Sequence, residues 1–290
     1  MDLNIQWYPG HMTKTKRLIT ENLKLVDIVI ELLDARIPIS SKNPDFDLLA
    51  NNKPRIIIMN KSDLANEQKN LEWKQWFEQK GFGVILVNSI TGKGIGQVPE
   101  QAKKMLTEKI ERDRQRGRIF RPIRAMVVGV PNVGKSTFIN KLVGKATAKT
   151  GDRPGVTRGK QWIKIKKNFE LLDTPGILWP KFDDAKVGLH LAFTGAIKDD
   201  ILDIEEIALE FIRFFQLTFP QALEQRYGLM AHDLLGTPLD ILLCIGKKRG
   251  FLKSGGEIDT LRTAQVLFDE FRGGKLGRFT LENIPSAFNG

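Results

Sequence analysis

The chain has 290 residues, 41% of them hydrophobic, and its 45 lysines and arginines exceed its 34 aspartates and glutamates by a formal net charge of +11. This length and apolar content suit one or two folded domains and exclude an intrinsically disordered chain. The single cysteine, Cys244, excludes a disulfide framework and is typical of a buried thiol in a reducing compartment. No secretory signal opens the sequence and no stretch is apolar enough to cross a membrane, so we expect a cytoplasmic protein whose positive charge favours anionic partners.

The first part of the chain alternates short apolar strands with helices. After a turn at Pro9-Gly10 and a basic helix, β-branched runs predict strands at 26–33, 55–59 and 83–87. Helices are expected at 67–80 and 97–116. Such alternation predicts a parallel sheet covered on both faces, in which ligands bind beyond the carboxyl ends of the strands.

Asn60, Lys61, Ser62 and Asp63 follow the second strand and form the pattern N-K-S-D. An aspartate carboxylate accepts hydrogen bonds from N1–H and the exocyclic amino group of guanine, whereas adenine presents a lone pair at N1. Sites built on such required hydrogen bonds reject the analogue that lacks them by roughly 10⁴–10⁵. We therefore expect Asp63 to select guanine, Asn60 to tie the base edge to neighbouring loops, and the stem of Lys61 to lie over the ring.

Asn88 and Ser89 follow the third strand and are expected at the same edge of the sheet. We expect Ser89, with the main-chain N–H of Ile90, to support Asp63 and to meet the guanine carbonyl. The third strand therefore contributes to the same base-binding site.

A phosphate-binding loop follows a strand expected at 123–128. Residues Gly129 to Ser136 form G-x-x-x-x-G-K-S, and helical spacing of apolar residues continues to Val143. The glycines let main-chain N–H groups wrap a polyphosphate, and the helix N-terminus adds its dipole. Lys135 would reach the β and γ phosphates. The residues expected to bind nucleotide here are Asn132, Val133, Gly134, Lys135, Ser136 and Thr137.

The remaining chain changes character near residue 180. Two strands, at 161–166 and 169–172, end at Asp173-Thr174-Pro175-Gly176. Past Pro180 the strand signal disappears, and several helices carry capping residues such as Asp203 and Thr237. The expected helices are 184–193, 204–219, 221–227, 239–248 and 258–271. We expect an α/β domain over 1–179 and a smaller all-α domain over 180–290.

The order of the motifs indicates a circular permutation. In ordinary small GTPases the phosphate loop precedes the guanine-binding residues, whereas here 60–63 and Ser89 precede Gly129–Ser136 and Asp173–Gly176. The same sheet forms if the old termini are joined and new ones are opened after Gly176. With these motifs in this order, the chain resembles over its whole length the circularly permuted GTPases of the YlqF/RbgA group, ribosome biogenesis GTPase A. The resemblance extends to Trp7–Met12, Asp34–Arg36 and Lys247–Gly256.

The resemblance implies a circularly permuted P-loop GTPase domain, with a mostly parallel sheet and helices on both faces, followed by a smaller all-α C-terminal domain. It also implies GTP hydrolysis during late assembly of the large ribosomal subunit, with the rRNA of the precursor bound in the GTP state and released on hydrolysis. Two alternatives stay open, a GTP-dependent RNA-binding scaffold and a translation-associated switch. We expect no membrane partner and a monomer in solution.

Phosphoryl transfer needs charge neutralisation more than covalent help from the protein. The expected cofactors are GTP and Mg²⁺, with K⁺ as a further candidate. Mg²⁺ would bind the hydroxyls of Ser136 and Thr157, with Asp173 beside it and Gly176 near the γ-phosphate, while Lys135 neutralises phosphate charge. A plain turn is the alternative for the stretch around Thr157.

The water-orienting glutamine that usually follows Asp-x-x-Gly is absent, and Ile177 stands in its place. We expect slow intrinsic turnover and stimulation by the ribosomal particle. The resemblance suggests His11 as the group that positions the water, because a neutral imidazole can do so; a structural or RNA-contacting role is the alternative. It also suggests that Asn132 helps to hold K⁺, the alternative being an asparagine chosen for turn geometry.

Three basic runs favour binding to a phosphate backbone. Residues 103–124 hold nine basic and three acidic side chains, and 141–167 hold nine basic side chains and one acidic. The third run, 247–256, interleaves charge with Phe251. No sheet-type RNA-recognition fingerprint is present, so we expect contacts to RNA shape and phosphate rather than to bases.

Overall fold

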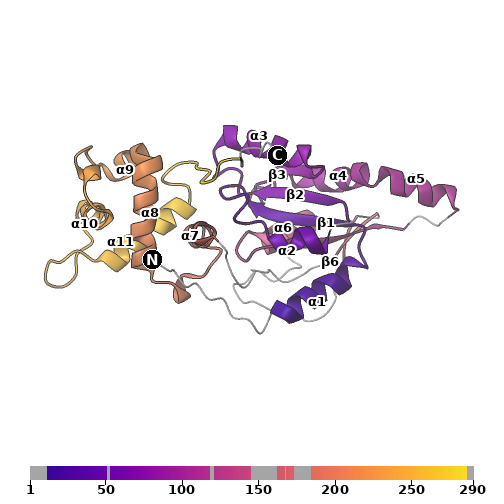
Figure 1. Ribbon diagram of the computed structural model, residues 1–290, viewed down its shortest axis with the longest axis horizontal. Coiled ribbons are helices and arrows are strands. Elements are labelled where there is room, and N and C mark those ends of the chain that lie inside the picture. The colour runs from indigo at the N-terminus through magenta and orange to yellow at the C-terminus, as the bar shows by residue number, and fades with distance from the viewer. Residues whose placement is uncertain are drawn as a thin grey trace. The chain divides into compact units, whose positions relative to one another are not determined.

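The computed structural model describes residues 12–50, 53–117, 121–144, 162–166, 168–172 and 184–285. The chain divides into two compact units, one of residues 1–183 with 280–290 and the other of residues 184–279 (Figure 1). The expected boundary between residues 179 and 180 lies outside the described residues. The segment from Thr280 onward belongs to the first unit, although the sequence led us to expect it in the helical domain.

The first unit is built on a six-stranded sheet with the order β3-β2-β1-β4-β6-β5. Neighbouring strands are parallel except for β5, which runs antiparallel to β6. This arrangement confirms the mostly parallel sheet expected from the sequence, and it brings β1 beside β4 from distant parts of the chain. The strands are β1 Ile28–Asp34, β2 Arg55–Asn60, β3 Gly83–Leu86, β4 Ile123–Gly129, β5 Trp162–Lys166 and β6 Phe169–Leu172.

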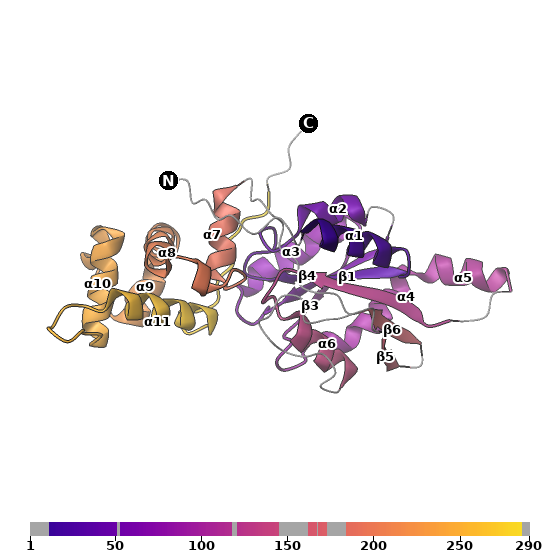
Figure 2. The same ribbon diagram turned by 90° about the horizontal axis from the view of Figure 1, so that it is seen from below.

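Helices cover both faces of this sheet, which explains why β1 is buried at every position. Figure 2 shows α1, α2 and α3 on one face and α4 and α6 on the other. On the first face Ile19 and Phe46 pack with Val29, and farther along Trp73 and Phe77 pack with the side chains of β2. The helices of this unit are α1 Met12–Leu23, α2 Pro44–Leu49, α3 Glu67–Gln79, α4 Val98–Met105, α5 Thr107–Gln115 and α6 Lys135–Val143.

Two helical predictions for the first unit need correction. The helix expected over 97–116 is two helices, α4 and α5, separated at Leu106, whose backbone leaves helical geometry at φ −105° and ψ 9°. Leu106 is buried, so the break lets this side chain reach the core. The sequence also failed to predict α2, which at six residues is too short to show a helical period.

The second unit is a helical bundle around α8, whose core is made of stacked and edge-on phenylalanine rings. The ring centroids of Phe211 and Phe215 lie 4.2 Å apart, and those of Phe193 and Phe211 lie 5.2 Å apart. Asp203 caps α8, and Thr237 with Asp240 forms a capping box on α10, as predicted. The helices are α7 Ala185–Phe193, α8 Ile204–Thr218, α9 Pro220–Tyr227, α10 Pro238–Arg249 and α11 Thr260–Arg272. Within the described ranges, none of the helices is long and apolar enough to cross a membrane.

Candidate nucleotide-binding site

Asn60 joins the carboxyl ends of three strands. It is the last residue of β2, and its side chain is buried. Its Nδ2 donates a hydrogen bond to the main-chain carbonyl of Val133 in the phosphate loop, at 2.7 Å. Its Oδ1 accepts from the main-chain N–H of Ser89 at 3.1 Å and from the Ser89 hydroxyl at 2.8 Å. The predicted base-binding and phosphate-binding segments therefore meet at one edge of the sheet.

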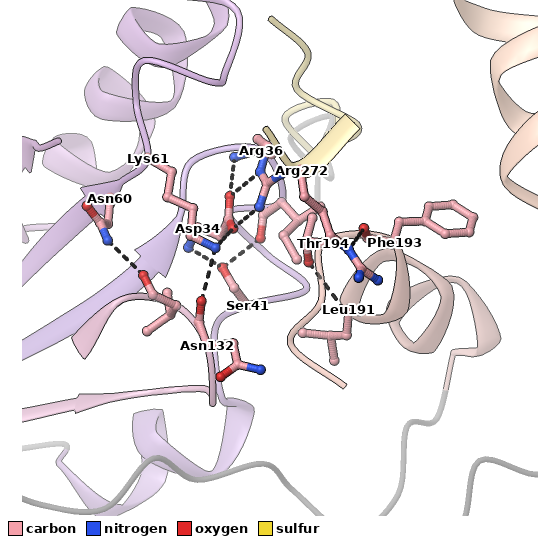
Figure 3. A network of polar contacts seen from close by, with 12 residues as sticks. Asp34, Arg36, Ser41, Asn60, Lys61, Asn132, Leu191, Phe193, Thr194 and Arg272 are labelled. Atoms are coloured by element: carbon pink, nitrogen blue, oxygen red, sulfur yellow. Dashed lines mark hydrogen bonds and ion pairs between the residues drawn. The ribbon is translucent and has the colours of Figure 1, made fainter. Parts of the chain in front are cut away.

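Lys61 lies across the same edge in a backbone conformation that L-residues rarely adopt, with φ at 57°. Its ammonium group donates to the main-chain carbonyl of Asn132 at 3.0 Å and lies 3.0 Å from Oδ2 of Asp34 (Figure 3). The side chain is only 24% exposed. Lys61 is thus held between the end of β1 and the phosphate loop.

Asp34 is the buried centre of a polar network at the end of β1. Its carboxylate accepts from Nε of Arg36 at 2.9 Å and from Nη2 at 2.7 Å, and its main-chain N–H donates to the Ser41 hydroxyl at 3.0 Å. Burial opposes ionisation of Asp34, but the charges of Arg36 and Lys61, with the Arg36 hydrogen bonds, outweigh it and hold the pKa of this carboxyl well below its usual range. Asp34 is therefore a fixed negative charge.

The phosphate loop has the tight geometry that its glycines predict. Gly134, with φ at 96°, caps α6, and a Cβ at that position would lie 2.4 Å from Nδ2 of Asn60. A Cβ at Gly129 would lie 2.8 Å from the main-chain oxygen of Leu32. Lys135 and Ser136 are half-buried in the first turn of α6, and Thr137 is exposed. The helix N-terminus and the loop N–H groups can together accept an anionic phosphate chain.

Ser136 is the described member of the expected Mg²⁺ ligands, because Thr157 and Asp173 lie outside the described residues. Among the side chains that the structure describes, no group of three or more His, Cys, Asp or Glu could hold a metal ion. A lone hydroxyl beside a phosphate-binding loop fits Mg²⁺, which takes most of its ligands from phosphates and water rather than from a protein cage.

Two expected base contacts have different partners in the structure. The Ser89 hydroxyl donates to Asn60 and not to Asp63, and the N–H of Ile90 donates to Oδ1 of Asn88 at 2.9 Å. The buried amide oxygen of Asn60 needs donors, whereas Asp63 is exposed and open to water. Ser89 is therefore connected to the predicted base-binding segment through Asn60.

Ser62 and Asn88 shape this edge of the sheet. The Ser62 hydroxyl donates to the main-chain carbonyl of Val87 at 3.1 Å, which ties the end of β2 to the residue after β3. Oδ1 of Asn88 accepts from the N–H groups of Ile90 and Thr91, both at 2.9 Å, and so closes the following turn. Three further site predictions, His11, Thr157 and Gly176, fall outside the described residues, as does Asp173.

Three residues of this network, Arg36, Ser41 and Glu282, were not predicted to belong to the site. Glu282 accepts from the N–H groups of Ile39 and Ser40, at 2.6 and 3.0 Å, and so holds the loop that follows β1. The position of Asp34 at the end of a predicted strand indicated that polar side chains near it, such as Arg36 and Ser41, could belong to the site. No local pattern marks Glu282, which reaches the loop from the far end of the chain.

Comparison with known proteins gives consistent matches. A family model described as "50S ribosome-binding GTPase" matches residues 124–210, which begin in β4 just before the phosphate loop. The chain is 49% identical to ribosome biogenesis GTPase A of Bacillus cereus, over 98% of this chain and 95% of that protein. It is 34% identical to the protein of that name from Thermotoga maritima, over 96% of this chain and 94% of the relative.

Two solved structures resemble the fold over nearly its whole length. The GDP-bound structure of TM YlqF superposes with a TM-score of 0.67 at 28% identity, covering 93% of this chain and all of that one. The crystal structure of GNP-bound YlqF from T. maritima gives a TM-score of 0.66 at 30% identity, covering 93% of this chain and 98% of that one. Both neighbours hold guanine nucleotides.

Proposed function

Because the chain belongs to the ribosome biogenesis GTPase A family and is a GTPase, we propose that it acts in late assembly of the large ribosomal subunit. It would bind the rRNA of a subunit precursor with GTP bound, and GTP hydrolysis would release it. The observation that carries the nucleotide-dependent part of this proposal is the hydrogen bond from Asn60 to Val133, which joins the N-K-S-D segment to the phosphate loop at one site. The description of the matching family model supports the large subunit as the partner.

Guanine would bind at the end of β2. Asp63 is exposed there and offers its carboxylate to N1–H and the exocyclic amino group of the base, while the half-buried stem of Lys61 covers one ring face. Asn60, Ser62, Asn88 and Ser89 would hold these two residues in place through the hydrogen bonds already described.

The triphosphate would lie along the loop from Asn132 to Thr137. Gly134 caps α6, so main-chain N–H groups of the loop and of the first helical turn would bind phosphate oxygens, while Lys135 would supply positive charge and Ser136 would offer its hydroxyl to Mg²⁺. Mg²⁺, when bound, neutralises charge on the phosphate oxygens. Thr157, Asp173 and Gly176 would complete this part of the site.

Hydrolysis would be slow in the isolated protein, since Ile177 cannot orient a water molecule. We propose that His11 does so when the ribosomal particle is bound, and that the particle stimulates turnover. The test compares His11→Ala with the unsubstituted protein, alone and with large-subunit precursors. Unchanged hydrolysis in both conditions would exclude a catalytic His11.

Asn132 would assist hydrolysis by holding K⁺ near the phosphates. Its main-chain carbonyl accepts from the positively charged Lys61, which disfavours a second cation there, so its exposed side-chain oxygen would be the ligand for the ion. GTPase rates measured in KCl and in NaCl of equal ionic strength test this role, and equal rates would rule it out.

Two basic surfaces would contact RNA. The helix α5 has no buried residue, and Arg112 and Arg114 are exposed on it. In the helical unit, Lys247 and Lys253 are exposed on α10 and the loop after it, whereas Phe251 lies under the guanidinium of Arg262 at 4.6 Å. Contacts to phosphate rather than base stacking on Phe251 would dominate, so affinity should fall steeply with salt.

Depletion of the protein in cells tests the proposal, with profiling of the ribosomal particles that accumulate. Late precursors of the large subunit should accumulate, and the purified protein should co-sediment with them in a non-hydrolysable GTP analogue but not in GDP. Preference for mature ribosomes would favour a translation-associated switch instead. Normal particles after depletion, together with nucleotide-independent RNA binding, would favour a scaffold.

A further inference from the structure

Asp34 is a buried, charged side chain that the expected nucleotide contacts leave out. It ends β1 and lies opposite Asn60, the last residue of β2, in the parallel register of the two strands. We propose that Asp34 is a positioning residue for guanine binding: its carboxylate holds the ammonium group of Lys61, so that the lysine stem keeps its place over the base. The inference rests on the proposed role of residues 60–63 in binding guanine.

The geometry around Lys61 supports this role. The ammonium group lies between two acceptors on different strand ends, Oδ2 of Asp34 and the carbonyl of Asn132, each 3.0 Å away (Figure 3). A lysine side chain has many rotamers and loses conformational entropy when it is held in one of them. The carbonyl offers only a dipole, whereas Asp34 offers a full charge. Loss of Asp34 would therefore leave the stem free to move off the base.

Asp34 is itself held rigidly, which a positioning role requires. The side chains of Asp34 and Arg36 are only 4% and 1% exposed, and their bidentate pair fixes the plane of the carboxylate. The main chain of Asp34 is held as well, because its N–H donates to the Ser41 hydroxyl, which donates in turn to the carbonyl of Ile37 at 2.7 Å. Because the carboxylate of Asp34 is fixed by these contacts, its ion pair with Lys61 also fixes the position of the ammonium group.

The opposite end of the same strand provides a matched control. Asp27 directly precedes β1, is 7% exposed, and pairs with Lys109 and with Arg121 at 2.7 Å. Asp27 and Asp34 are thus both buried carboxylates paired with two cations, at the two ends of one strand. Only Asp34 lies at the carboxyl end, where the nucleotide is expected.

The test measures binding of a fluorescent GDP analogue to Asp34→Asn, Lys61→Met and the double variant, with Asp27→Asn as control. Asp34→Asn should raise Kd about fivefold, the upper end of the effect expected when an ion pair to a partly exposed lysine is lost. In the Lys61→Met background the same change should alter Kd less than about twofold, because the residue it acts through is gone. Asp27→Asn should lower the unfolding midpoint and leave Kd unchanged.

The outcomes separate this inference from the proposed function. If Lys61→Met binds the analogue normally, the proposed role of Lys61 in guanine binding fails, and the inference fails with it, while recognition of the base by Asp63 is tested separately. If Lys61→Met weakens binding but Asp34→Asn does not, or if Asp34→Asn weakens binding equally in both backgrounds, only the positioning role is overturned. Should Asp34→Asn not fold, Ser41→Ala replaces it, with an expected rise in Kd of about threefold that disappears in the Lys61→Met background.

Discussion

The Nδ2 of Asn60 donates to the main-chain carbonyl of Val133 at 2.7 Å, and this contact joins the end of β2 to the phosphate loop after β4. The contact depends on where the strands lie in the sheet and not on their order in the chain. A GTPase site can therefore form although its base-binding segment precedes its phosphate-binding segment. Because Nδ2 of Asn60 lies so close to the phosphate loop, residue 134 has no room for a side chain.

Gly134→Ala should strongly weaken nucleotide binding. A Cβ there would lie 2.4 Å from Nδ2 of Asn60, and φ at 96° is unfavourable for alanine. We expect a loss of GDP affinity of at least about 100-fold and of roughly 1–3 kcal/mol in unfolding free energy. Calorimetric titration with GDP and urea denaturation measure the two effects.

Gly144→Ala is the control that separates backbone strain from the clash. Gly144 caps the other end of α6 with φ at 74°, and its Cβ would meet nothing within 4 Å. This variant should lose stability and retain GDP binding. Equal affinities for the two variants would show that the contact with Asn60 does not matter.

Glu31→Gln should change how stability depends on pH. Burial raises the pKa of Glu31 to about 7 against an ordinary value of 4.5, with Lys42 and Arg55 opposing the shift. Between these two values the unfolded chain has lost the proton that the folded protein keeps, so stability falls as pH rises to about 7 and is constant above it. The fall should be about 3 kcal/mol, and Glu31→Gln should remove it.

Urea denaturation of both proteins between about pH 5 and pH 8 isolates residue 31, because all other titrating groups are shared and cancel in the difference. The substituted protein should gain relative stability as pH rises. Parallel profiles would mean that Glu31 is solvated or paired well enough with Arg55, whose Nη1 is 3.5 Å away, to keep an ordinary pKa.

The local patterns predicted the sheet well, because runs such as Ile56–Ile58 are β-branched, apolar and bounded by turn residues. The N-K-S-D and phosphate-loop patterns also predicted which strand ends would come together. What local patterns could not predict depends on distant partners. Glu282 reaches the loop after β1 across most of the chain, and Ser89 bonds to Asn60 because that amide is buried. Neither relationship has a signal in neighbouring residues.

Glu282→Gln should destabilise the first unit. Its two carboxylate oxygens accept from the N–H groups of Ile39 and Ser40, and the neighbouring N–H of Leu281 donates to the carbonyl of Arg36 at 2.8 Å. Glutamine keeps only one acceptor oxygen, so a buried N–H loses its partner at a cost of about 1–3 kcal/mol. Urea denaturation measures the loss.

Glu72→Gln is the control for this change of charge. Glu72 pairs with Lys69 on α3, and both side chains are more than one third exposed. That substitution should alter the unfolding free energy by less than about 0.5 kcal/mol. A similar small effect at Glu282 would mean that the C-terminal segment is not anchored by this carboxylate.

Asp63→Asn should change the preferred base from guanine to xanthine. Asp63 is exposed beyond the end of β2, beside the anchored Lys61, and we expect its carboxylate to accept from two donors of guanine. Asparagine turns an amide N–H toward the exocyclic amino group of guanine, so two donors face each other and GDP affinity should fall by about 10³ or more. Xanthosine diphosphate carries an oxygen at that position and should bind better.

Because Asp63 is exposed, the substitution should leave the unfolding midpoint unchanged, which separates loss of recognition from loss of folding. Calorimetric titration of the variant with GDP and with xanthosine diphosphate measures the preference. If Asp63→Asn still preferred GDP, the base would have to be recognised elsewhere, and the convergence of β2 and β4 would serve the phosphates alone.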